Sequence, residues 1–415
     1  MDRVILSCGR ITYALLAGLA MIVVSLNPAH TATVGAYTIQ SGLTAAFATV
    51  ITLGVDRAVA RRRASGEILY DLPRGMLALR TIEICCIIVI AILACVINPA
   101  WFWIAFTSAT FAITRLIYSD LETQWIASNR SIRTLGIVVA TNGILTAIGI
   151  VVAAPFGSNA MILGSSLGNI VAFVLVAILG RWQIGPTESD HLTTESVSFG
   201  LSTGLAVIYS RIDLLIIAAL GVNLHAVAVY GVITRVFDAL GQIRGSIAQI
   251  ESRSLAALAP GIRFAATLRM TRRVLIVTAA GAIISALACA VVVPLPLFHA
   301  WAGNTQLFFI ACAALIAYFF HLSTTALVFA DRRSHLLLVG SLVAALGATL
   351  VKFLLITWSG IGGAVAAIGV SEALSFSIFI WLYRAHGTRQ KVLGMTFLAI
   401  GAALIPVIAA GVLSK

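Results

Sequence analysis

Charged side chains lie in the middle of several long apolar stretches of this sequence. The segment VIYSRIDLLIIAAL, residues 207–220, carries Arg211 and Asp213, and the next apolar stretch carries Arg235 and Asp238. A charge near the centre of a membrane-spanning helix costs about 2.5–3.5 kcal/mol on insertion scales, so such side chains usually face a partner or a polar cavity. Guanidinium groups stay charged and bind phosphate through paired hydrogen bonds. The chemistry available is therefore anion recognition by the arginines or cation exchange at the acids.

Helical spacing limits how these charges can pair. Arg211 and Asp213 are two residues apart, about 200° around a helix, and cannot face each other, whereas Arg235 and Asp238 share a face. Because a tight turn joins the two stretches, they should be antiparallel neighbours. We therefore expect Asp213 to lie near Arg235, and Arg211 to face a cavity together with Arg115. An alternative stays open, in which all these charges form ion pairs that only hold helices together.

The candidate site residues fall into three groups. We expect Arg115, Arg211 and Arg235 to line a cavity and bind an anionic substrate. Candidates for binding a coupling ion or for ion pairing are Asp213, Asp238, Glu372 and His321. Lys352 is expected to extend to the membrane interface, and the charges nearer the cytosolic surface to act as anchors; these are Arg10, Arg57, Arg80, Glu83, Asp120, Glu122 and Arg244. The six cysteines lack metal-ligand spacing, and we expect neither a metal site nor a cofactor.

The composition shows what must position these residues. Of the 415 residues, 60% are hydrophobic and 10% are charged, and the mean hydropathy is +1.05. Soluble domains are about 45–50% apolar and about 25% charged, so this chain is an integral membrane protein. Its net charge of +12 is spread over short loops rather than one basic face, which argues against nucleic-acid binding.

Thirteen apolar runs are long enough to cross a bilayer as helices. They lack the alternation of apolar and polar residues that is typical of the strands of membrane β-barrels. The runs are 5–27, 33–56, 76–97, 101–122, 134–154, 159–180, 197–220, 224–248, 273–295, 304–329, 335–357, 361–383 and 392–412.

Charge asymmetry in the loops predicts orientation. The loops after the even runs carry the arginines, and those after the odd runs carry no Lys or Arg. This places the N-terminus of a multi-pass protein in the cytosol. We expect the membrane to be a bacterial inner membrane. The outer loops are minute, and the longest inner loop, RWQIGPTESDHLTTES at residues 181–196, reads as a linker.

These features predict four parts. Residues 1–182 form an N-terminal six-helix lobe, residues 183–196 a cytosolic linker, residues 197–385 a C-terminal six-helix lobe, and residues 386–415 an additional membrane helix. A weak internal repeat indicates that the two lobes are duplicates of each other. The segments TATVGAYTIQSGL and LHAVAVYGVITRV align when Tyr37 is placed on Tyr230, an offset of 193 residues. The offset spans an even number of helices, which implies a parallel repeat of the kind that transporters use.

The segment YSRIDLLIIAALGVNLHAVAVYGVITRV resembles the polysaccharide transporter family, the Wzx-type flippases of the multidrug/oligosaccharidyl-lipid/polysaccharide exporter superfamily. Asp213, Gly221 and Tyr230 match its pattern. The segment VGAYTIQSGLTAAFATVITLGVDRAVARR is similar to the family's second helix, with matches at Gly35, Tyr37, Gly54 and Arg57.

The resemblance implies an all-α polytopic fold with two six-helix lobes around a central cavity. Relatives have twelve or fourteen helices, so the extra C-terminal helix expected in this chain departs from their pattern. The resemblance also implies alternating access and the movement of undecaprenyl-diphosphate-linked oligosaccharide repeat units to the outer leaflet for surface polysaccharide synthesis. The implied partners are the lipid-linked sugar, the bilayer, a coupling proton or sodium ion and other polysaccharide export machinery, without nucleic acid.

Other functions remain open on the sequence. A cation-coupled multidrug exporter of the same superfamily needs acidic cavities, and the acids here are few and accompanied by arginines. A lipid II flippase is a further alternative. We do not expect an enzyme, because the outer loops offer only His30, His225 and His299 for acid–base work. A non-transporting scaffold is disfavoured because no loop carries a docking motif.

Overall fold

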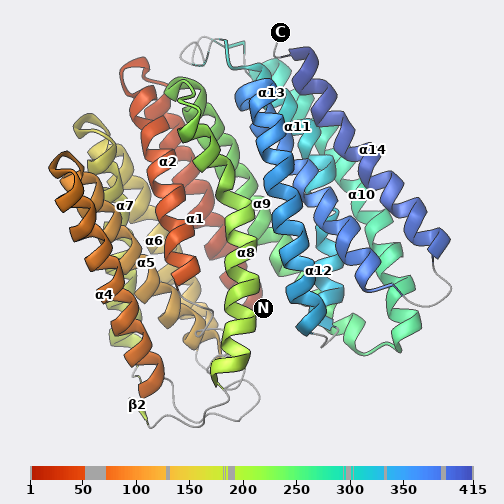
Figure 1. The fold of residues 1–415 in the computed structure, drawn as a ribbon, viewed down its shortest axis with the longest axis horizontal. Coiled ribbons are helices and arrows are strands. Elements are labelled where there is room, and N and C mark those ends of the chain that lie inside the picture. The colour runs from red at the N-terminus through yellow and green to blue at the C-terminus, as the bar shows by residue number, and fades with distance from the viewer. Residues whose placement is uncertain are drawn as a thin grey trace. The chain divides into compact units, whose positions relative to one another are not determined.

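The computed structural model is built almost entirely of helices (Figure 1). It describes residues 2–51, 72–127, 131–180, 182, 184–185, 192–292, 294–295, 301, 303–330, 334–384 and 389–413. The chain divides into two compact units, which we call unit 1 (Met1–Val207) and unit 2 (Ile208–Lys415). The expected all-α polytopic fold with two helical lobes is confirmed. The finer boundaries at residues 182, 196 and 385 stay predictions, and Arg57 lies outside the described residues.

Unit 1 is a bundle in which α1 packs along α6, α6 along α7, and α7 along α5 (Figure 1). Helix α5 also carries α2 and α4 against its surface. The helices are α1 (Asp2–Ser25), α2 (Pro28–Ile51), α4 (Arg74–Ile97), α5 (Phe102–Ala127), α6 (Ile132–Ala153) and α7 (Ser158–Gly180). Two-residue strands β1 (Leu72–Pro73) and β2 (Ile184–Gly185) pair in parallel, and short 3-10 turns cover Pro99–Trp101 and Ala154–Phe156.

Unit 2 begins within α8, which crosses the division between the units. Helix α9 packs on α12, and α13 packs on both α11 and α14. The elements are α8 (Leu192–Ala219), α9 (Leu224–Ala256), α10 (Pro260–Val292), α11 (Gln306–Tyr318), α12 (His321–Ala330), α13 (Ser334–Leu382) and α14 (Arg389–Leu413).

The helices occupy the thirteen expected runs, with shifted ends. Among the described residues, ten helical segments are long and apolar enough to span a membrane. One of them, Leu338–Leu382, holds two expected spans, because α13 breaks at Ser359 and Gly360. Gly360 has a φ of 56°, which favours glycine because it has no Cβ. The expected run 304–329 is interrupted between α11 and α12.

Asparagine side chains begin the second helix after two tight turns. Asn27 Oδ1 accepts a hydrogen bond of 3.1 Å from the amide of Ala29 before α2. Asn223 Oδ1 accepts one of 2.9 Å from the amide of His225 before α9. These caps satisfy amides that have no partner inside the helix. The two turns that suggested a repeat therefore start their helices by the same device.

Helices α6 and α7 touch through backbone atoms. A Cβ placed on Gly149 would lie 2.1 Å from the carbonyl oxygen of Gly164, and one on Gly164 would lie 2.2 Å from that of Gly149. Such small-residue contacts let helices in lipid approach closely.

Replacing Gly149 with leucine should separate α6 from α7 and destabilise the protein by about 1–3 kcal/mol, the usual cost of overpacking. Thermal unfolding in detergent measures the loss. Gly281→Leu is the matched control, since a Cβ at Gly281 meets no atom within 4 Å. Equal melting temperatures for the two variants would contradict the prediction.

Candidate functional site

Two arginines share one carboxylate in unit 2. Nη2 of Arg211 on α8 donates hydrogen bonds of 2.7 and 2.8 Å to the two carboxylate oxygens of Asp238 on α9. Nη1 of Arg235 lies 3.7 Å from Oδ2 of the same Asp238. The three side chains are 24–32% exposed. Together they carry a net charge of +1 and are open enough to meet a ligand.

Asp213 pairs with Lys352, which links α8 to α13. The Nζ of Lys352 lies 3.4 Å from Oδ1 of Asp213, and each side chain is 3% exposed. The expected pairing of Asp213 with Arg235 is therefore wrong, as is the expected extension of Lys352 to the membrane interface. The reason is tertiary: Lys352 on α13 reaches Asp213 on α8 and supplies an ammonium where the sequence suggested a guanidinium.

Arg244 links α9 to α11 and α13. Its Nη1 lies 2.7 Å from Oε2 of Glu372 and donates a hydrogen bond of 3.0 Å to the carbonyl oxygen of Tyr318. Its guanidinium lies 4.4 Å from the centre of the Tyr318 ring, and the Tyr318 hydroxyl donates to the carbonyl oxygen of Phe237 at 2.9 Å. The expectation that Arg244 is only an interfacial anchor is wrong.

Arg244 also explains how the break between α11 and α12 is tolerated. Tyr318 is the last residue of α11, where carbonyls lose their helical partners. Backbone polar groups at membrane depth must find partners inside the protein. The guanidinium of Arg244 is such a partner for the carbonyl oxygen of Tyr318. His321 begins α12 just beyond, with its Nδ1 3.0 Å from Thr324 Oγ1 and its ring 5.5 Å from the ring of Phe379.

The charges of unit 1 form two further ion-pair groups. Arg10 on α1 binds Glu122 on α5 through Nη2 at 2.6 Å. Arg80 on α4 binds Glu83 on its own helix and Asp120 on α5, with a 2.9 Å bond from Nη2 to Asp120 Oδ1. These residues, expected as anchors, instead fasten helices to one another.

Arg115 differs from the other arginines at mid-helix. It lies at the middle of α5 with its side chain half-buried. Among the residues that the structure describes, no acid forms an ion pair with it. The expectation that Arg115 and Arg211 face one cavity stays a prediction, because the two lie in different units.

The mid-helix charges are therefore unequally satisfied. Within the described part of the chain, each acid at mid-helix has a cation within 4.0 Å: Glu83, Asp120, Glu122, Asp213, Asp238 and Glu372. Arg115 has no acid, and Arg235 shares the one that Arg211 holds more closely. The surplus is cationic. No group of three His, Cys, Asp or Glu side chains that could hold a metal ion occurs among the described residues.

Arg235 lies near Asp238, as their three-residue spacing allowed. Arg211 binds the same carboxylate, and its expected place in a cavity with Arg115 stays a prediction. The buried pair of Lys352 was missed, although one sequence signal was available: unbroken apolar residues flank this lysine on both sides.

No protein-family model matches the chain, and no curated protein matches it. The fold of the chain does match solved structures. The lipid II flippase MurJ in an inward closed conformation superposes with a TM-score of 0.71 at 9% identity, covering 99% of this chain and 97% of that one. An inward-facing multidrug resistance MATE family transporter of the MOP superfamily gives 0.59 at 14% identity, covering 93% and 96%. A MOP superfamily transporter from Pyrococcus furiosus, described as having a binding pocket of reverse polarity, gives 0.52 at 13% identity, covering 95% and 96%. The chain shares the fold of these transporters.

Proposed function

We propose that this protein is a flippase that moves an undecaprenyl-diphosphate-linked oligosaccharide repeat unit from the inner to the outer leaflet for surface polysaccharide synthesis. The observation that carries the proposal is the charge balance at mid-helix. Each described mid-helix acid has a cationic partner, with Glu83 and Asp120 sharing Arg80. In the described part of the chain Arg115 has no acidic partner, and Arg235 shares Asp238 with Arg211.

A diphosphate suits this balance chemically. It brings negative charge and several acceptor oxygens, and guanidinium binds such groups through paired hydrogen bonds. Arg211 and Arg235 converge on Asp238 and are about a quarter exposed, so a diphosphate could replace or extend the bonds that they make to this carboxylate.

The rival function is export of cationic drugs, which needs an acid free to bind the drug. None of the described mid-helix acids is free of a cationic partner. The TM-score also favours the flippase, since it is 0.71 for the lipid II flippase and 0.59 for the multidrug transporter. Lipid II is itself a diphosphate-linked sugar lipid, so the same chemistry would serve it. The coupling proton or sodium ion stays a prediction, with Asp213, Asp238, Glu372 and His321 as its candidate groups.

The direct test is deletion of the gene followed by analysis of cell lipids. We expect diphosphate-linked oligosaccharide to accumulate in the inner leaflet and surface polysaccharide to disappear, with restoration when the gene is supplied again. Unchanged lipids combined with raised sensitivity to cationic drugs would support the exporter instead.

A further inference from the structure

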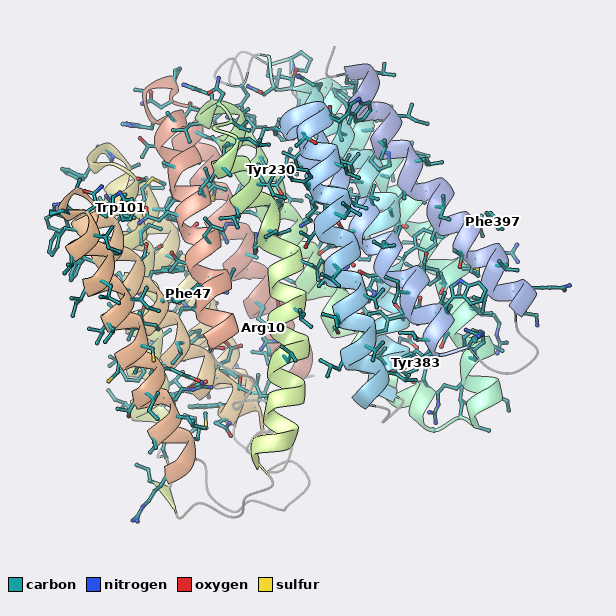
Figure 2. All side chains as sticks on the ribbon, viewed as in Figure 1. Arg10, Phe47, Trp101, Tyr230, Tyr383 and Phe397 are labelled. Atoms are coloured by element: carbon teal, nitrogen blue, oxygen red, sulfur yellow. The ribbon has the colours of Figure 1, made fainter. Side chains whose placement is uncertain are left out.

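An apolar groove runs along unit 1 between α2, α4 and α5. Its volume is about 330 Å³, and Phe47, Ile90 and Ile104 form parts of its walls. These three side chains are 41–48% exposed, so the groove is open rather than sealed. Figure 2 labels Phe47 on α2 and Trp101, which lies at one end of the groove. The volume falls within the range of about 300–1,000 Å³ seen for small-molecule sites.

The groove is long. Its wall extends from Trp101, just before α5, to Ala112 on α5, about 16 Å at 1.5 Å of rise per residue, which is about half of the ~30 Å hydrocarbon core. Its polar wall group Ser108 is already engaged, since Gln40 Nε2 lies 3.1 Å from its hydroxyl. One hydrocarbon chain, lying parallel to the helices, fits such a shape.

One arginine comes shortly after the groove wall along α5. Arg115 follows Ala112 by three residues, about 4.5 Å along the helix axis. It is seven residues from Ser108 and eleven from Ile104, so each of these two residues lies within about 20° of Arg115 around the helix. The groove wall and Arg115 are thus on one face of α5. Among the described residues Arg115 has no ion-pair partner. An arginine of a membrane-spanning helix therefore lies next to a groove with the shape of one hydrocarbon chain.

The remaining charges near this end do not neutralise Arg115. Arg80, Glu83 and Asp120 form their own group, and Asp120 lies about 140° around α5 from Arg115. This group fastens α4 to α5 and so fixes one wall of the groove.

We propose that the groove binds the isoprenoid chain of a polyprenyl phosphate lipid while Arg115 holds its phosphate. The proposal rests on the proposed function, of which it is a more specific form. A polyprenyl phosphate has one hydrocarbon chain for the one groove and one phosphate for the one guanidinium without an ion-pair partner. A phospholipid has two chains, and the groove has room for one. In the predicted orientation Trp101 is at the outer end of α5. The bound lipid would then have its phosphate nearer the cytosol than its chain.

The test uses the full-length protein in nanodiscs of neutral phosphatidylcholine, with undecaprenyl phosphate as the probe and native mass spectrometry as the readout. Arg115→Gln should weaken binding about tenfold or more, because it removes a charge-assisted contact to phosphate. Ala91→Phe should do the same, because Ala91 lines the groove and a ring there would fill it. The matched control is Ile92→Phe, whose side chain is 56% exposed and does not line the groove.

Three results would overturn the inference: no binding by the unmodified protein, unchanged binding by both variants, or equal occupancy by phosphatidylglycerol in competition. Inorganic phosphate should not compete, since it lacks a chain. Melting temperatures of the variants show whether each one folds, and Arg115→Lys, which keeps the charge, should retain part of the binding. Translocation measured separately distinguishes the two proposals. Binding without translocation would refute the proposed function alone, whereas translocation with unaltered binding by the variants would refute the groove alone.

Discussion

Replacing Lys352 with methionine should destabilise the protein by about 3–5 kcal/mol, because the change leaves the carboxylate of Asp213 buried without a partner. Both side chains are 3% exposed, so water cannot take the place of the ammonium. The measurement is thermal unfolding in detergent, together with the folded yield in membranes. This is the largest stability effect that we expect in the molecule.

The double variant Lys352→Met with Asp213→Asn supplies the control. It removes both charges, so it should recover most of the stability that the single variant loses. A double-mutant cycle then gives the coupling between the two residues. The pair would not be a structural unit if Lys352→Met alone left the melting temperature unchanged, or if the double variant were no better than the single one.

Transport should depend most strongly on Arg235 and Arg211. Arg235→Gln removes surplus positive charge and leaves the 2.7 Å pair of Arg211 with Asp238 in place. We expect it to fold normally and to lower translocation at least about tenfold, the effect of about 1.4 kcal/mol lost from the rate-limiting barrier. Arg211→Glu, which sets two acids beside each other, should abolish translocation altogether. The assay is movement of the lipid-linked oligosaccharide in reconstituted vesicles.

Arg269→Gln is the matched control for Arg235→Gln. Arg269 is exposed on α10, so the substitution changes net charge by the same amount without touching the cluster around Asp238. If Arg235→Gln translocates as fast as Arg269→Gln, the surplus charge at Asp238 has no part in substrate binding.

The positions of the helices could be predicted from the sequence because each is a local property. An apolar run of sufficient length specifies a span, and the break at Gly360 coincides with the predicted division between two runs. The break between α11 and α12 escaped prediction because the residues around Tyr318 and Phe319 are apolar. Its stabilisation comes from Arg244, 74 residues away along the chain.

Partners of the buried charges were harder to predict for the same reason. The contact of Arg235 with Asp238 follows from helical spacing alone. Asp213 pairs across α8 and α13 with Lys352, which is 139 residues further along. Nothing in a single sequence states which face of α13 meets α8. The surplus of cations was predictable as a count, but which arginine carries it was not.

The contact between Gly149 and Gly164 also limits how unit 1 can deform. Backbone lies against backbone there, with no side chain to change rotamer and absorb a displacement. Shear motions in proteins depend on side chains that adjust while packed helices slide. A slip of α6 along α7 would bring bulkier residues into the position that the two glycines keep clear. Whatever work unit 1 performs, these two helices should travel together, and any sliding should occur at other boundaries.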